Sequence, residues 1–189
     1  MVAMGITRLK RTAYHEAGHT VLGAAINDMP ELVSIRAEGA ALGRTRHQMC
    51  ASPSILVQVH MAGFAAEEVL TGRRPRRLQK GLSRSITAAL HKYPLLLQQV
   101  ENDDEYMAAV AVIEQGCAST LADVQQDIIR YYVIAKESLE TVWKCVDAVA
   151  KALLKHEELD RRSIAAIVAA AGDIYLPVDK VQCRHGLLR

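Results

Sequence analysis

A mainly helical α+β fold is predicted, in which a helical bundle carries a small two- or three-stranded β-sheet beside an N-terminal helix. Composition is the first observation: 50% of the 189 residues are hydrophobic, yet only 4% are aromatic. Sheets depend on aromatic and β-branched side chains, so this bias favours helices. The second observation is that apolar residues recur every three or four positions along most of the chain. A chain of this length suffices for one packed domain.

The first half of the chain predicts a helix, two strands and a second helix. Residues 6–26 form the first helix, because they carry an apolar stripe at helical spacing: Leu9, Ala13, Ala17, Val21 and Ala24. Residues 27–30 end this helix with a polar, proline-containing turn. Residues 32–36 alternate like a half-buried strand, and residues 42–48 are its expected partner. A second helix is expected over residues 55–70.

The second half predicts further helices after a polar break at residues 72–77. Weaker helical patterns occupy residues 82–91 and 103–114. Three stronger helices are expected over residues 121–135, 136–156 and 161–171. Asp160 is suited to cap the last of these helices at its start, and Gly172 is suited to end it.

Charge and cysteine usage exclude several classes of protein. The 23 basic and 21 acidic residues nearly balance, and the basic run at residues 73–77 has no interleaved aromatic residue, so nucleic acid is not an expected partner. The longest apolar run, residues 164–172, is far below the ~20 residues of a membrane span. Four widely spread cysteines predict neither a disulfide framework nor a zinc knuckle, and no signal peptide is apparent, so a cytoplasmic location is expected.

A His-Glu-x-x-His pattern at His15, Glu16 and His19 lies on the first predicted helix. Residues four apart share one helix face, so both imidazoles can reach one cation. Two imidazoles and a carboxylate suit Zn²⁺ with one open position, and Glu16 can act beside the metal without binding it. Gly18 within this helix indicates that a strand or substrate presses against it. The alternative is a chance cluster on a solvated helix face.

Four segments, in the same order along the chain, carry a family resemblance: residues 8–21, 33–45, 61–72 and 135–160. They include Tyr14-His15-Glu16-Ala17-Gly18-His19, Gly39-Ala40-Ala41-Leu42-Gly43-Arg44-Thr45 and Ala65-Ala66-Glu67-Glu68. These segments resemble the peptidase domain of FtsH-type zinc proteases. The resemblance implies a single peptidase-like domain over residues 1–172, with an insertion at 73–115 relative to the family and a C-terminal tail at 173–189.

The resemblance also implies a third zinc ligand, an aspartate that opens a helix. Asp123 is the best match to that motif. A favourable interaction with the helix dipole is the other interpretation of Asp123. Glu67 is the runner-up ligand, with Glu68 behind it. The alternative interpretation of both is a helix-face charge or a hydrogen-bond partner of a histidine.

The implied function is a zinc-dependent metallopeptidase, with Zn²⁺ on His15, His19 and Asp123, and Glu16 as the base that takes a proton from water. An extended substrate would pair with one strand, through Ala40, Ala41, Leu42, Gly43, Arg44 and Thr45. No phosphate-binding loop is present, so peptides or already unfolded segments are the expected substrates, cleaved without ATP in this chain. His47 is either an oxyanion-stabilising group or a surface strand histidine.

Two other functions remain open at this stage. A non-catalytic, peptidase-like interaction module, with or without zinc, would act through a partner. A zinc hydrolase of a non-peptide amide would use the same water activation. A homo-oligomer and a separate ATPase partner are both compatible with the sequence.

Overall fold

The computed structural model describes most of the chain, namely residues 6–37, 43–47, 52–76, 78, 86–87, 89, 103–116, 120–172 and 174. The helices are α1 (Arg8–Ala25), α2 (Pro53–Thr71), α6 (Asp104–Glu114), α7 (Leu121–Thr141), α8 (Trp143–His156) and α9 (Arg161–Ala171). The strands are β1 (Leu32–Ser34), β2 (Arg44–Arg46) and β3 (Glu158–Asp160). The predicted α+β, mainly helical class is confirmed.

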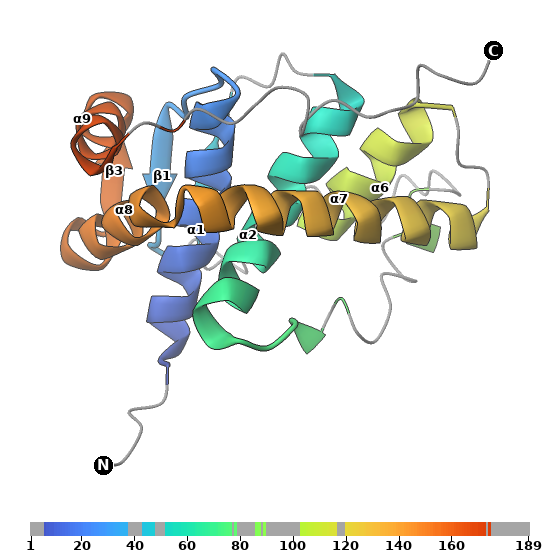
Figure 1. Cartoon of the computed structure of the whole chain (residues 1–189), viewed down its shortest axis with the longest axis horizontal. Helices are drawn as coiled ribbons and strands as arrows, with labels where there is room; N and C mark the ends of the chain where they lie inside the picture. The colour runs from blue at the N-terminus through green and yellow to red at the C-terminus, as the bar shows by residue number, and fades with distance from the viewer. Residues whose placement is uncertain are drawn as a thin grey trace.

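Helix α2 is the centre of the bundle, because it packs against α1, α6 and α7. In Figure 1 the long helix α7 lies across α1 and α2, and α6 lies beside α2. Small residues on α2, such as Ala62 and Ala66, are fully buried and let the helices approach closely. A Cβ at Gly18 of α1 would meet the Ala62 carbonyl oxygen at 2.5 Å. The neighbour that presses on Gly18 is therefore helix α2, and not a strand or substrate.

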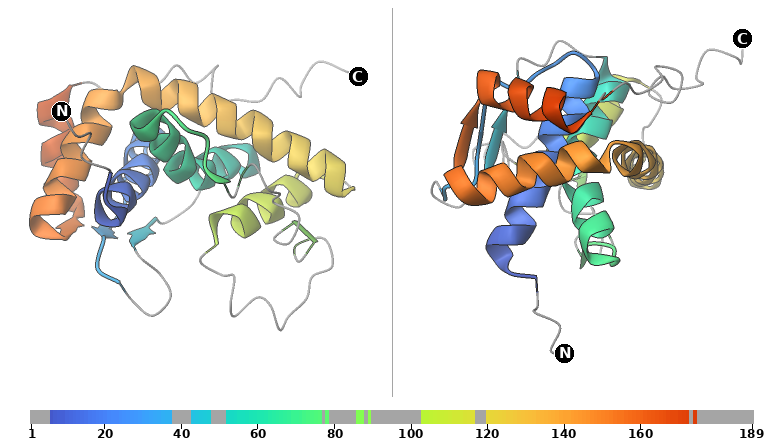
Figure 2. Two further views of the ribbon diagram at one scale, coloured as in Figure 1. Left: turned by 90° about the horizontal axis from the view of Figure 1, so that it is seen from below. Right: turned by 60° about the vertical axis from the view of Figure 1, so that its left-hand side comes forward.

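A small antiparallel sheet has the strand order β2-β1-β3. Val33 of β1 pairs with Thr45 of β2 on one side and with Leu159 of β3 on the other. Strands β1 and β2 contact α1, while β3 contacts α8 and α9 (Figure 2). The two expected strands thus form, and β2 is an edge strand as the substrate-pairing hypothesis requires. The third strand comes from residues 158–160, a polar-apolar-polar stretch that is too short, between two helices, to predict a strand from sequence.

The boundary between the helices expected over residues 121–135 and 136–156 lies later in the chain. The second of them, α8, begins at Trp143 and not at residue 136. Helix α7 continues through residues 136–141, and the break falls at Val142, whose φ and ψ are −112° and 23°. Ser138 and Leu139 are buried on the face that α7 already presents, so packing extends the helix past the expected boundary. The caps of α9 are as predicted: the Asp160 carboxylate accepts a hydrogen bond from the Ser163 amide at 2.8 Å, and Gly172 ends the helix.

Some predictions fall on residues that the structure does not describe. The substrate-strand residues Ala40, Ala41 and Leu42 are among them, as are most of the expected helix at 82–91 and all but Ile174 of the C-terminal tail. None of the described helices combines the length and the hydrophobicity that crossing a bilayer requires.

Candidate metal centre

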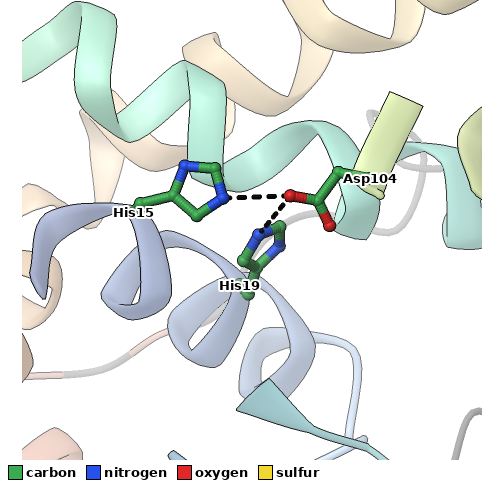
Figure 3. Close-up of side chains that lie close together, drawn as sticks. All are labelled: His15, His19 and Asp104. Carbon is green, nitrogen blue, oxygen red and sulfur yellow. Dashed lines mark hydrogen bonds and ion pairs between the residues drawn. The ribbon is translucent and has the colours of Figure 1, made fainter. Parts of the chain in front are cut away.

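Three side chains from two helices converge on one point (Figure 3). His15 and His19 lie one turn apart on α1, and Asp104 is the first residue of α6. Asp104 Oδ2 is 2.9 Å from His15 Nε2 and 3.3 Å from His19 Nε2. One ligand atom from each residue lies within 4.8 Å of the others, and among the described residues this is the group that could hold a metal ion. The donor set, two imidazole nitrogens and a carboxylate oxygen, is one that Zn²⁺ prefers.

Both histidine rings are oriented by their other nitrogen. His15 Nδ1 donates to Glu67 Oε1 at 2.8 Å, and His19 Nδ1 donates to the Val59 carbonyl oxygen at 2.7 Å. A neutral imidazole that donates through Nδ1 carries its lone pair on Nε2. Both lone pairs then face the Asp104 carboxylate, an arrangement that requires a cation or protons between them. Carboxylate and carbonyl acceptors of this kind are typical partners of metal-binding histidines.

A glycine on α2 lets both histidine rings lie close to the backbone of that helix. A Cβ at Gly63 would lie 2.4 Å from His15 Nε2 and 2.5 Å from His19 Nε2. Any side chain at this position would therefore displace the two candidate ligand atoms. The ring orientation and the donor chemistry together fit a small cation, and Gly63 permits both rings to keep this orientation.

The two imidazoles and the Asp104 carboxylate shift one another's pKa strongly. Burial lowers the pKa of His15, but hydrogen bonds to Asp104 and Glu67 outweigh it and raise that pKa well above its usual value. Burial also lowers the pKa of His19, but attraction to Asp104 outweighs burial and raises that pKa. Burial raises the pKa of Asp104, but the charge of His19 and the hydrogen bond from His15 hold it well below the usual range. A metal ion would compete with protons for these histidine nitrogens.

Glu16 lies beside the metal-ligand group but does not belong to it. The residue is 6% exposed, and its carboxylate accepts a hydrogen bond from Thr45 Oγ1 at 2.8 Å. Burial raises the pKa of Glu16, while the nearby His15 and His19 and the Thr45 hydrogen bond oppose that rise. A buried carboxylate next to a cation, held without binding it, has the position that a general base requires.

The expectation for Asp123 as third ligand is not met. Its carboxylate forms a capping box at the start of α7: the Thr120 amide donates to Asp123 Oδ2 at 3.2 Å, and the Thr120 hydroxyl donates to it at 2.7 Å. Asp123 is exposed and lies outside the histidine group. The motif that favoured Asp123 is a genuine helix start, but capping accounts for its carboxylate. Asp104 replaces Asp123 as the candidate ligand.

The two alternative ligands, Glu67 and Glu68, have different positions. Glu67 accepts from Nδ1 of His15, so it contacts the ring nitrogen that faces away from Asp104 and orients the histidine. Glu68 points to α7, where Tyr132 donates to its Oε2 and Lys136 Nζ lies 2.7 Å from its Oε1. The structure thus favours the hydrogen-bond alternative for Glu67 and a helix-joining role for Glu68.

Asp104 was missed because it lies within residues 73–115, the segment interpreted as an insertion. A usable signal was present, since Asn102-Asp103-Asp104-Glu105 opens a helix that the sequence already predicts. Asp103 is the cap of α6 and accepts from the Glu105 amide at 3.1 Å. Asp104, one position later, is therefore available to face the histidines from a helix N-terminus, where the helix dipole favours a negative charge.

The described part of the expected substrate strand lies at the sheet edge. Gly43, Arg44 and Thr45 precede or belong to β2, with Arg44 exposed and Thr45 turned toward Glu16. His47 follows the strand and has a side chain only 5% exposed, with Nδ1 3.2 Å from the Asp28 carbonyl oxygen. The interpretation of His47 as a surface histidine is therefore wrong, and its oxyanion alternative stays a prediction.

Comparison with known proteins shows a distant similarity. No family model matches the chain. The chain is 26% identical over 184 residues to an ATP-dependent zinc metalloprotease FtsH from Syntrophus aciditrophicus (strain SB). That alignment covers 84% of this chain but spans only about a quarter of the length of that relative, 25%. The match supports a distant relationship to FtsH-type proteases, in agreement with the motifs quoted from the sequence.

Proposed function

We propose that this chain is a zinc-dependent metallopeptidase that cleaves peptides or unfolded polypeptide segments without using ATP. The observation that carries the proposal is the convergence of His15 Nε2, His19 Nε2 and an Asp104 carboxylate oxygen within 4.8 Å of one another. The glycine at position 63, where a side chain would collide with both Nε2 atoms, supports a role for these two nitrogens. The distant similarity to a zinc metalloprotease supports the same chemistry. The cytoplasmic location and the single domain over residues 1–172 stay predictions.

Each side chain of the candidate centre has its own role in the proposed reaction. His15, His19 and Asp104 would hold Zn²⁺, with Glu67 fixing the ring of His15. A bound Zn²⁺ supplies Lewis-acid chemistry: it polarises a carbonyl and lowers the pKa of water toward ~7. Glu16 takes the proton of the attacking water on its carboxylate and returns it to the leaving amine.

An extended substrate would be held by main-chain hydrogen bonds at the free edge of the sheet. Strand β2 is the outermost strand in the order β2-β1-β3, and its Thr45 side chain faces Glu16. A peptide added at this edge would pair with the strand whose Thr45 side chain contacts the base. Main-chain pairing recognises any extended chain, so weak sequence preference is expected.

The test is a comparison of zinc content and proteolysis between the wild-type chain and Glu16→Gln. The wild type is expected to bind zinc and to cleave casein or a quenched peptide without nucleotide. Glu16→Gln is expected to keep its zinc and to lose about 10²- to 10⁴-fold in kcat, because general base catalysis contributes that much. Glu137→Gln, which removes an exposed carboxylate on α7, is the matched control and should cleave at the wild-type rate.

The outcomes separate the competing functions. Wild-type cleavage that persists in Glu16→Gln would contradict the assigned base. A zinc-loaded wild type that cleaves no peptide would favour the interaction module or a hydrolase of another amide, and a chain that binds no zinc would end the metallopeptidase proposal.

A further inference from the structure

We infer that Thr45, together with the backbone at Gly43, is a positioning device that fixes the Glu16 carboxylate from the edge strand. The inference rests on the proposed function of Glu16 as general base. Thr45 Oγ1 is 2.8 Å from Glu16 Oε2 and 3.3 Å from the Glu16 backbone oxygen, so the hydroxyl proton is donated to the carboxylate over the shorter distance. Within the described residues, Thr45 supplies the hydrogen bond that this carboxylate receives.

Gly43, which directly precedes β2, leaves room for the same carboxylate. A Cβ at Gly43 would lie 2.5 Å from Glu16 Oε1 and 2.7 Å from Glu16 Cγ. A side chain at this position would therefore push the carboxylate away from Thr45. A glutamate side chain has three rotatable bonds, and the Thr45 hydrogen bond with the close packing at Gly43 limits the orientations that it can adopt.

Position on the edge strand gives this arrangement a consequence for catalysis. Thr45 lies within β2, which in the described part of the chain pairs with β1 and is the outer strand of the sheet. A peptide that adds to the other side of β2 would pair with the strand that already carries the hydroxyl. The base and the peptide main chain would then be aligned by the same strand. Alignment of this kind lowers the barrier of a step that joins two reactants.

Thr20 provides a matched control for a buried threonine hydroxyl near the base. Its Oγ1 donates to the Glu16 backbone oxygen at 2.8 Å, and the residue is fully buried. Thr20→Val therefore removes a hydroxyl bound to the same residue without touching the carboxylate. Thr45→Val and Thr20→Val are the same chemical change at two positions, and only the first should alter the position of the base.

The first experiment measures kcat and KM of zinc-loaded wild type, Thr45→Val, Thr45→Ser, Gly43→Ala and Thr20→Val on a quenched peptide. Thr45→Val and Gly43→Ala are expected to lower kcat by about tenfold to a hundredfold, because a small misplacement of a catalytic group has that effect. KM should stay within about twofold, and zinc content should not change. Thr45→Ser should recover most of kcat, and Thr20→Val should resemble the wild type.

A merely structural role of Thr45 in β2 would give a different pattern. It would raise KM, because the substrate pairs with this strand, and Thr45→Ser would not recover the rate selectively. Either result would overturn the inference, as would an unchanged kcat in Thr45→Val, and in these cases the wild-type activity would leave the proposed function intact. A zinc-loaded wild type without activity would overturn both.

The second experiment needs no turnover. A double-mutant cycle compares the unfolding of zinc-free wild type, Thr45→Val, Glu16→Gln and the double variant in urea. The effects of the two substitutions are expected to be non-additive, because Thr45→Val removes the donor of one hydrogen bond and Glu16→Gln replaces its charged acceptor by a weaker, neutral one. The corresponding cycle with Thr20→Val should be closer to additive. Additive effects of Thr45→Val and Glu16→Gln would show that the two side chains do not interact, and would overturn the inference.

Discussion

At the residue scale, each histidine of the candidate centre uses both of its ring nitrogens. Nδ1 of His15 and of His19 donates to a fixed oxygen, and Nε2 of each faces Asp104. The other nitrogen of each ring thereby fixes which nitrogen would be free to bind a cation. Gly63 belongs to this arrangement because any side chain there would collide with both Nε2 atoms.

Gly63→Ala tests whether the undisturbed position of the two imidazoles serves zinc binding. A methyl group there would come within 2.5 Å of both histidine Nε2 atoms, so we expect zinc affinity to fall by about tenfold or more, as for other disturbances around metal ligands. A competition titration against a chromogenic chelator measures the change. The atoms that the methyl meets belong to two side chains rather than to backbone, so the zinc-free variant should still fold. Wild-type zinc affinity in Gly63→Ala would contradict this role.

Local residues of the centre could be predicted from sequence, whereas the distant ligand could not. His15, Glu16 and His19 are related by helix geometry alone, and four residues of spacing suffice to bring two imidazoles together. Asp104 is 89 positions from His15, and only the packing of α6 beside α2 brings it there. The choice of Asp123 failed because an aspartate in a capping box and an aspartate that binds a metal have the same sequence context.

At the scale of elements, helix α2 carries contacts to the centre and to α7 on successive residues. Glu67 orients His15, while Glu68 contacts Tyr132 and Lys136 of α7. Arg74, just beyond α2, lies over the Tyr132 ring at 5.1 Å. These contacts fix the end of α2 against α7, and the packing of α2 in turn sets where Gly63 meets α1. Such cross-helix partners cannot be read from helical periodicity, which predicts a buried face but not its neighbour.

Glu68→Gln tests the contacts of Glu68 with α7, called here the α2–α7 joint, through the pH dependence of the free energy of unfolding. Burial raises the pKa of Glu68, but hydrogen bonds from Lys136 and Tyr132 outweigh it and leave that pKa below 4.5. The joint therefore stabilises the fold above the unfolded pKa and loses its effect as pH falls through the lower folded pKa. We expect Glu68→Gln to reduce the free energy of unfolding by about 1–2 kcal/mol at pH 7, with the difference shrinking toward pH 3.

Urea unfolding at a series of pH values measures this difference. Glu137→Gln, an exposed position on the same helix as Lys136, should stay within about 0.5 kcal/mol of the wild type throughout. A difference between wild type and Glu68→Gln that is the same at pH 3 and pH 7 would contradict the account of the joint.

At the scale of the whole molecule, the fold brings together three segments that are far apart in the chain. Helix α1 supplies the histidines and Glu16, the edge strand β2 holds Glu16, and α6 supplies Asp104. Each segment packs on α1 or α2, so the two central helices act as the frame of the centre. The mainly helical class and the positions of these elements follow from composition and periodicity. Their assembly around one point depends on long-range packing.

The binding of zinc by wild type, Asp104→Asn and Asp123→Asn tests the central claim most directly. Wild type and Asp123→Asn are expected to bind one zinc ion per chain with equal affinity, because Asp123 caps α7 and lies outside the histidine group. Asp104→Asn should lose the charged ligand and bind zinc about a hundredfold more weakly or not at all. Elemental analysis measures the number of zinc ions bound per chain, and chelator competition measures the zinc affinity. Zinc that stays bound in Asp104→Asn and is lost in Asp123→Asn would contradict the account.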